Sequence, residues 1–342
     1  MSLIIHLLPL KNTLHRPVVP CPSWRGRSDG DFVTIRSMKS KPARPAPKRH
    51  HYVSQVLLKQ FCAMADGKEG ICQIEVIDGR TIDPKPSKSM GFEWHMFKHK
   101  GEWMEKLWQE VEGPMGDVCK TLAEGRPEDV EPRKVAVSDF IALHFARSLE
   151  TKRIHRDSYV KMERQTRANR EMQLKLATLR YPMLNLELAT SVLESMSESV
   201  LEPIQNQEAM GSPFQEFVES AFACTRQQLS NYSLSIRSAL SGTEYLLGDC
   251  PAVGIDRGMN PRRRPPLFEA KALIMPLSTQ YAAIVYPRSS EDPVFSVDPT
   301  GDEEVLAINH GQIAQSQKRV FYRPGSGHET TVRTYLGLSK FE

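Results

Sequence analysis

The spacing of apolar residues predicts that regular structure begins near residue 51. From Val53 to Phe61, apolar side chains recur every three or four positions, which indicates a short helix. The next segment, Ile71 to Asp78, alternates in the manner of a strand, and Gly79 supplies a turn, so that Arg80 to Asp83 can pair back as a second strand. We therefore expect a short helix followed by a small hairpin.

Helical spacing dominates the next part of the chain, from residue 85 to residue 230. Its first stretch contains Gly113 and Pro114, which should kink or split a helix. The stretch Val135 to Ser148 is strongly apolar on its inward face. Residues 150–181 are densely charged, which is typical of a solvated helix face. The expected helices cover Trp103 to Leu122, Val135 to Ser148, residues 150–181, Leu184 to Leu201 and Pro213 to Ser230.

The remaining third of the chain is rich in strand-forming residues that are separated by Gly, Pro and Asn. A covering helix is expected at Ala307 to Lys318, and a last short strand from Val320. The fold class is therefore α+β, with a mostly helical N-terminal part that includes the small hairpin, and a C-terminal antiparallel or mixed sheet packed by helices. The expected strands are residues 231–239, 243–249, 270–278 and 281–287.

Residues 1–48 differ in composition from the rest and are expected to form a disordered basic leader. For residues 1–37, we prefer the interpretation that translation starts at Met38 to the interpretation that they form a functional arm. Residues 49–335 are expected to form a single domain, helical over 85–230 and β-rich over 231–335. The first 49 residues hold ten Lys/Arg and two Asp, a net +8, so the rest of the chain carries −4 of the total of +4. A mildly acidic body gives only weak support to nucleic acid as a partner.

Membrane insertion and secretion both lack a sequence signal. No apolar run reaches the roughly 18 residues that a membrane span needs. The six cysteines include no C-x-x-C pair, and the first residues lack the charged region and cleavage site of a signal peptide. We therefore expect reduced thiols, a cytoplasmic location and no membrane partner, and the sequence does not predict the oligomeric state.

Several polar residues are candidates for chemistry, each with a structural alternative. The pair His50 and His51 lies where the leader meets the folded part, although histidines at a helix start more often pack or cap than bind metal. Glu105 and Glu112 would share one face of an unbroken helix, where acidic side chains normally meet solvent. Arg147 ends the apolar helix, and a buried arginine needs a carboxylate or phosphate partner.

Two further candidates lie in the β-rich part. Asp249 follows the apolar run at 245–247, and such strand ends carry catalytic groups and structural Asx turns about equally often. The run Arg262 to Arg264 could meet phosphate, but loops of this kind are mostly solvated. Motifs for nucleotide, dinucleotide and zinc-protease sites are missing, so no organic cofactor is implied.

The order of the longer motifs resembles a family of uncharacterised proteins, the domain of unknown function numbered 4238. The motifs are HHYVSQVLLKQF, MEKLWQEVE, FIALHFARS, YLLGDCPAV, IMPLS and AINHGQIAQSQKRVFY, and the resemblance extends from Lys48 to Tyr322. The family has proline at the position of Ser54, and usually a Ser-Asp-Asn-Pro-like string in place of Gly248 to Pro251. The resemblance implies no reaction, but it singles out the polar residues His51, Glu105, Glu112, Arg147, Asp249 and Asn309.

If these six residues converge, hydrolysis is the chemistry that suits them best. The carboxylates would act as a base or hold a divalent metal ion, with Glu112 and Asp249 as ligands, His51 would transfer protons, and Arg147 would steady an anionic oxygen, as in a phosphodiester. The alternative is a structural network in which Arg147 joins Asp249 and Glu112, in a protein that binds a ligand or a protein partner without catalysis. A catalytic set must reach a cleft, whereas a structural set can be fully buried and satisfied.

Overall fold

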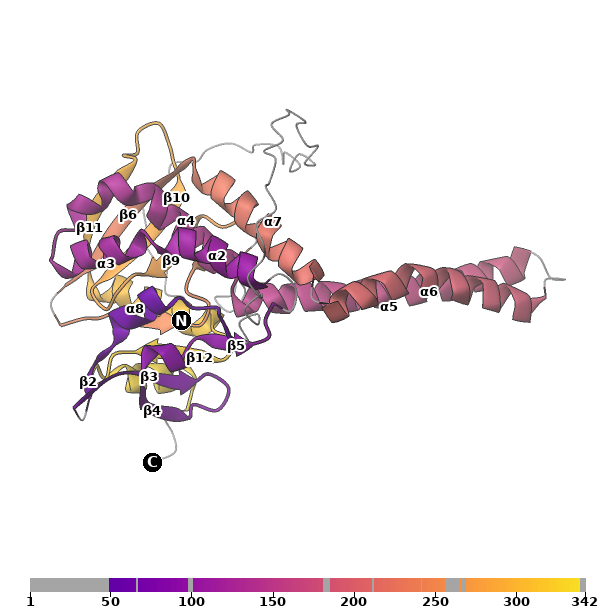
Figure 1. Ribbon diagram of the computed structural model, residues 1–342, viewed down its shortest axis with the longest axis horizontal. Helices are drawn as coiled ribbons and strands as arrows, with labels where there is room; N and C mark the ends of the chain where they lie inside the picture. Colours follow the sequence, from indigo (N-terminus) through magenta and orange to yellow (C-terminus); the bar gives the residue numbers. More distant parts are fainter. Residues whose placement is uncertain are drawn as a thin grey trace, which may run out of the picture. The chain divides into compact units, whose positions relative to one another are not determined.

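The computed structural model describes residues 49–338, apart from 66, 98–100, 181–184, 211, 241, 256–264 and 266–268 (Figure 1). Of the two units into which the chain divides, the described residues all belong to the second, Ala46–Glu342. The expected leader and the expected arginine-rich loop, 262–264, lie outside the described residues.

The described chain begins with a short strand, β1 (Arg49–His51), which pairs antiparallel with β5 (Phe92–Trp94). His51 is opposite Phe92 in this ladder, so it lies in a strand and not at a helix start as expected. The expected helix is present but begins later, because Ser54 has an extended backbone and caps a single turn, α1 (Gln55–Leu58), that continues into η1 (Lys59–Phe61).

A five-stranded mixed sheet forms the centre of the second unit. Its order is β11-β6-β10-β9-β8. The pair β11 and β6 is parallel, and all other pairs of neighbouring strands in this sheet are antiparallel. Alternate residues of its strands face two different cores: Leu273 and Met275 contact the larger one and Ile274 the smaller one. The strands are β6 (Tyr232–Ala239), β8 (Val253–Ile255), β9 (Ala272–Pro276), β10 (Tyr281–Pro287) and β11 (Phe295–Thr300).

A second sheet combines the N-terminal hairpin with strands from the end of the chain. Its order is β2-β3-β12-β7, and β4 pairs with β3 as the predicted hairpin partner. The prediction of a strand over 243–249 was largely wrong, because only its end is a strand. The strands are β2 (Ala63–Ala65), β3 (Lys68–Glu75), β4 (Thr81–Lys85), β7 (Leu247–Gly248) and β12 (Arg319–Tyr322).

The backbone of the stretch before β7 is held by α8 (Asp302–Gln315) and not by a neighbouring strand. Asn309 accepts the Leu246 N–H at 2.9 Å, and Gln312 accepts the Gly248 N–H at 2.8 Å. Buried backbone groups need partners, and here helix side chains supply them. α8 also contributes Ile308 to the core beneath the mixed sheet.

The helices that lie between β5 and β6 along the chain follow the sequence pattern closely. Gly113 and Pro114 separate α2 from α3, as expected, and α4 ends next to Arg147. α4 packs against α7, and both contribute to the larger core together with α2 and one face of the mixed sheet. These helices are α2 (Gly101–Glu112), α3 (Met115–Ala123), α4 (Lys134–Ala146) and α7 (Ser212–Leu229), with η2 (Ser87–Ser89) and η3 (Pro127–Arg133) before α2 and α4, and α9 (His328–Tyr335) near the end.

Two long helices, α5 (Leu149–Arg180) and α6 (Leu186–Met210), run side by side as a hairpin (Figure 1). The sheets and helices together confirm the α+β class. Within the described residues, no helix is both long enough and apolar enough to cross a membrane.

Candidate functional site

Four of the six candidate residues lie close together where β1, α2 and α4 meet. Glu105 and Glu112 are on α2, Arg147 follows the last residue of α4, and His51 ends β1. Together with His144 of α4, they form what we call the Arg147 cluster. Three elements that are far apart in sequence therefore bring polar side chains to one place.

Arg147 is the centre of the cluster and is wholly buried. Its Nη2 donates to Glu112 Oε1 at 2.5 Å, and its guanidinium carbon lies 4.9 Å from the centre of the Trp108 ring. The Arg147 side chain is 1% exposed, whereas that of Glu112 is 23% exposed. Glu112 therefore forms the side of the ion pair that reaches solvent.

His144 connects this ion pair to the start of α1. Its Nδ1 lies 3.0 Å from the carbonyl oxygen of Phe140, and its Nε2 lies 3.2 Å from the backbone nitrogen of Ser54 and 3.0 Å from Arg147 Nη2. The Ser54 and Arg147 groups are both donors, so Nε2 is the acceptor and the proton of the neutral ring is on Nδ1. Burial, and then the charge of Arg147, hold the pKa of His144 well below its usual value, in agreement with a neutral ring.

Glu105 and His51 are also shifted toward their neutral forms. Burial raises the pKa of Glu105 to about 7, and the nearby Glu112 adds to the rise while Arg147 opposes it. Burial lowers the pKa of His51, and Arg147 contributes to the decrease while Glu112 opposes it. A carboxyl group with a pKa near 7 can both give and accept a proton at neutral pH.

Five buried polar atoms in or next to the cluster have no hydrogen-bond partner among the described residues, and further atoms of this kind lie elsewhere in the fold. The five atoms belong to side chains on β1, on α2 and at the two helix ends nearest to Arg147. Most buried polar groups in folded proteins are paired, so each of these atoms is available to a ligand or to water. The atoms are His51 Nε2, Ser54 Oγ, Glu105 Oε1, Trp108 Nε1 and Arg147 Nε.

Asp249 and Asn309 are engaged elsewhere, with the backbone around β7 and β12. Asp249 accepts the backbone N–H groups of Gln317, Lys318 and Arg319 at 2.6–2.8 Å. Burial nevertheless raises the pKa of Asp249 to about 6, because these hydrogen bonds offset only part of the cost of burying its charge. Asn309 joins Leu246 to the carbonyl oxygen of Glu244. Through these described contacts, both side chains therefore support α8 and the loop next to it.

A cavity of about 340 Å³ lies close to the cluster in sequence and contact, although no member of the cluster lines it. Lys88 lines this cavity, and its backbone forms a hydrogen bond with His51. The other lining residues include the first residue of α1 and one residue of β3. They are Gln55, Lys59, Cys62, Glu69, Pro86 and Ser87.

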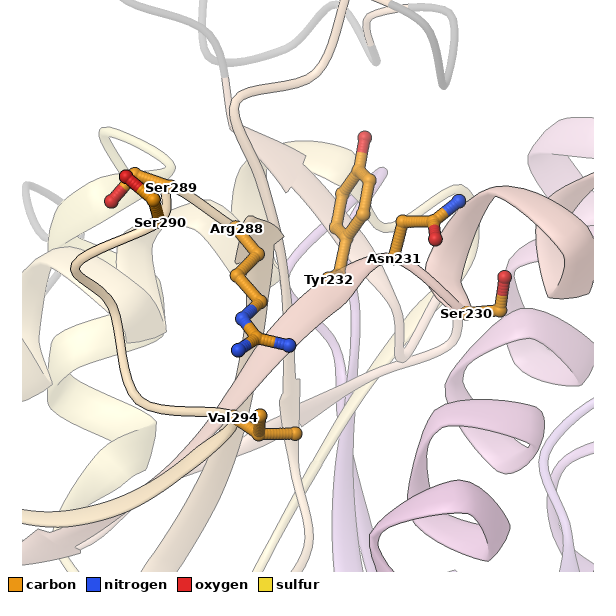
Figure 2. Close-up of a pocket in the computed structure, with 7 residues that line it drawn as sticks. All are labelled: Ser230, Asn231, Tyr232, Arg288, Ser289, Ser290 and Val294. Carbon is orange, nitrogen blue, oxygen red and sulfur yellow. The ribbon is translucent and has the colours of Figure 1, made fainter.

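A second cavity, of about 330 Å³, lies between the start of β6 and the loop after β10 (Figure 2). None of the six candidate residues lines it. Its lining residues are Ser230, Asn231, Tyr232, Arg288, Ser289, Ser290 and Val294.

His144, Trp108 and Ser54 are part of the site but were not among the candidates from the sequence. His144 lies on the apolar face of its helix, where the pattern predicts an ordinary inward-facing residue. Its position three residues before Arg147 was the available signal, because residues three apart share one face of a helix. Trp108 lies between Glu105 and Glu112 at the same kind of spacing.

The fold and the site define an α+β protein with a buried arginine–glutamate–histidine cluster. The chain belongs to the family described as protein of unknown function, DUF4238, whose model matches residues 49–326. No curated protein and no solved structure matches the chain. The functional argument therefore rests on the geometry of the cluster.

Proposed function

We propose that the Arg147 cluster is the active site of a hydrolase that acts on a phosphodiester or another anionic substrate. The observation that supports this proposal is the group of buried, unpartnered polar atoms on His51, Glu105 and Arg147 around one ion pair. A network built only for stability would pair such atoms, because each unpaired buried group costs about 1–3 kcal/mol. Atoms left unpaired at one place favour a site that binds a polar ligand.

Glu105 is the proposed general acid and base. Its pKa of about 7 keeps both protonation states populated at neutral pH. Such a pKa suits a group that first removes a proton from water and then returns one to the leaving group. His51, whose Nε2 has no described partner, is the second proposed proton carrier.

Arg147 is the proposed binding group for an anionic oxygen. Its Nε is unpartnered among the described atoms, while one of its terminal nitrogens holds Glu112. A guanidinium group presents several donors in one plane and therefore can keep one partner while it binds another. Lys59 and Lys88, which line the neighbouring cavity, would attract the same kind of substrate.

A divalent ion held by Glu112 and Asp249 stays a prediction of the sequence that the geometry does not favour. Both oxygens of Asp249 already accept backbone N–H groups. No group of three or more His, Cys, Asp or Glu side chains in the described residues is arranged to hold a metal ion. We therefore assign no step to a metal and test the dependence directly.

The proposal is tested with purified protein and chromogenic substrates: bis(4-nitrophenyl) phosphate, 4-nitrophenyl phosphate and 4-nitrophenyl acetate. We expect release of nitrophenol from the phosphodiester, and a decrease in kcat of about 10²–10⁴-fold in Glu105→Gln. The matched control is Glu110→Gln, which changes an exposed residue of the same helix and should leave kcat unchanged. EDTA, Mg²⁺, Mn²⁺ and Zn²⁺ are added in parallel to decide the metal dependence.

Equal rates for the wild type and Glu105→Gln would contradict the assigned role. Wild-type rates no higher than those of the buffer with all three substrates, with and without metals, would remove the support for this hydrolase and favour the second function.

The second candidate is a ligand-binding or protein-interaction module in which the cluster is structural. The observation in its favour is that Arg147 is wholly buried and contacts α2 and His144, which itself contacts the start of α1. In that case Arg147→Lys should lower the free energy of unfolding of the protein and leave the rate of nitrophenol release unchanged.

A further inference from the structure

The α5–α6 hairpin carries an unusual amount of exposed apolar surface. Of the fifteen large hydrophobic side chains that are exposed in the described part of the chain, eight lie on these two helices. After Thr151, none of the described side chains of α5 or α6 is buried. Helices in proteins owe most of their stability to the packing of an apolar face. Apart from the first three residues of α5, the described parts of these helices of 32 and 25 residues therefore lack the packing that the other long helices have.

The exposed apolar residues gather at the end of the hairpin where the chain turns. Met172, Leu176 and Leu179 are 55%, 58% and 79% exposed, and their spacing of four and three residues places them on one face of α5. Leu188 and Val192 share a face of α6 at the start of that helix. Because these stretches lie on either side of the turn, both helices offer apolar surface at the same end.

The two helices also have opposite charge. α5 contains nine Lys/Arg and four Asp/Glu, a net +5, and α6 contains five Glu and no Lys or Arg, a net −5. The hairpin as a whole is neutral. Its field at a distance therefore nearly cancels, and a long polyanion would be attracted by α5 but repelled by α6. A partner that fits both helices must itself carry a basic and an acidic strip side by side.

Charges on both helices remain available for such a partner. Within the hairpin, Arg170 of α5 and Glu194 of α6 form an ion pair at 3.9 Å, which shows which residues lie at the same level. Counted from that pair, the start of α6 is level with the end of α5, and Glu198 and Glu202 lie within two residues of the levels of Arg164 and Lys161. The charged side chains of the hairpin without an ion pair among the described residues include Lys161, Arg164, Lys175, Glu187, Glu198 and Glu202.

We propose that the partner of the hairpin is a second copy of this chain. The two hairpins lie with their turns at the same end, so that α5 of each copy packs against α6 of the other in a four-helix arrangement. Lys175 then lies at the level of the partner's Glu187, and Arg164 at the level of the partner's Glu198. Packing α5 against α5 would instead bring two basic helices together, which costs free energy.

This arrangement accounts for both observations on the hairpin. The apolar residues around the turn are covered by the same residues of the second copy, because a two-fold axis presents the same patch from both sides. The unpaired charges along the two helices meet charges of opposite sign at the same level. The proposal does not depend on the hydrolase assignment, since the hairpin contains none of the six candidate residues.

The test is the mass of the full chain in solution, measured by light scattering after size exclusion over a wide range of concentrations. We expect a dimer that dissociates on dilution. The variant Lys161→Glu/Arg164→Glu/Lys175→Glu makes α5 acidic, and Glu187→Lys/Glu198→Lys/Glu202→Lys makes α6 basic. Each variant alone should be monomeric, because like charges then face each other, and an equal mixture of the two should form a mixed dimer.

A second variant keeps the test decisive if charge reversal disturbs the hairpin itself, which circular dichroism reports. Leu176→Ser/Leu179→Ser leaves every charge in place and should also weaken the dimer. Its matched control is Ile77→Ser, which changes a side chain that is 85% exposed outside the hairpin and should have no effect.

Three results would overturn the proposal. The first is a wild-type protein that stays monomeric at all concentrations. The second is a dimer that survives both charge reversals, or reversed variants of normal helicity that fail to combine. The third is a monomer that binds heparin through α5 and loses this binding on charge reversal, which would assign the hairpin to a polyanion.

Discussion

Glu105→Gln should change the pH dependence of stability in a direction that the structure fixes. The pKa of Glu105 is raised from 4.5 to about 7 in the folded protein, mainly by burial. Between these two values the folded chain keeps a proton that the unfolded chain has lost. The free energy of unfolding therefore decreases as the pH rises through this window, and the penalty is complete above pH 7. Glutamine has the same shape and cannot ionise, so the variant lacks this decrease.

The size of the effect follows from the shift in pKa. A change of one pKa unit corresponds to about 1.4 kcal/mol, so the shift of Glu105 can change the free energy of unfolding by at most roughly 3 kcal/mol. Glu105 is only partly buried, and solvent screens part of the interaction, which reduces the expected value to about 1–2 kcal/mol. Relative to the wild type, Glu105→Gln should therefore gain about 1–2 kcal/mol between pH 5 and pH 8.

Urea unfolding at pH 5 and pH 8, followed by tryptophan fluorescence, measures this difference. Asp249 also titrates in this range and the pKa of His51 is lowered by burial, but both groups are present in both proteins and largely cancel in the comparison. Glu110→Gln is the matched control, because its side chain is exposed on the same helix, and it should follow the wild type at both pH values. A difference between Glu105→Gln and wild type that is independent of pH would refute the assignment of a raised pKa.

Three further substitutions test the supports of the fold, each by chemical unfolding. Arg147→Leu should cost about 3 kcal/mol, at the low end for a broken buried pair because Glu112 still reaches solvent. Asp249→Ala should cost at least about 3 kcal/mol, with or without EDTA, because three backbone N–H groups lose their acceptor. Gly91→Ala should cost clearly more than Gly67→Ala: both have positive φ, but a new Cβ at position 91 would lie 3.0 Å from Val53 Cβ and 3.3 Å from its carbonyl oxygen, whereas position 67 is open.

The helices were predictable from the sequence because their signals are local. The break between α2 and α3 follows from Gly113 and Pro114, and the apolar residues of α4 are close neighbours in sequence. Strand pairing depends instead on residues that are far apart. β11 pairs in parallel with β6, some sixty residues earlier in the chain, and its sequence FSVDPT gives little sign of it. The stretch before β7 has the composition of a strand, but the side chains of α8 bind its backbone.

The site was predictable only in part, namely where its residues are linked by local signals in the sequence. The spacing of Glu105 and Glu112 on one helix places them together, and the position of Arg147 at the end of an apolar helix implies burial next to a carboxylate or a phosphate. His51 was selected through the family resemblance, which also selected Asn309. The resemblance selects motifs, and motifs include residues that support the fold, so it cannot separate Asn309 from the cluster. That separation required the contacts of each side chain.

The charges of the Arg147 cluster limit what it can bind. Arg147 and Glu112 balance each other, His144 is neutral, and the pKa shifts of Glu105 and His51 both favour their neutral forms. With Glu105 protonated and both histidines neutral, the cluster has no net charge, and it becomes negative when Glu105 loses its proton above pH 7. It can compensate an anion by keeping the proton on Glu105 or adding one to His51. If the cluster binds an anion, as proposed above, that binding should be linked to proton uptake, whereas an ion pair that only joins three elements should show no such linkage.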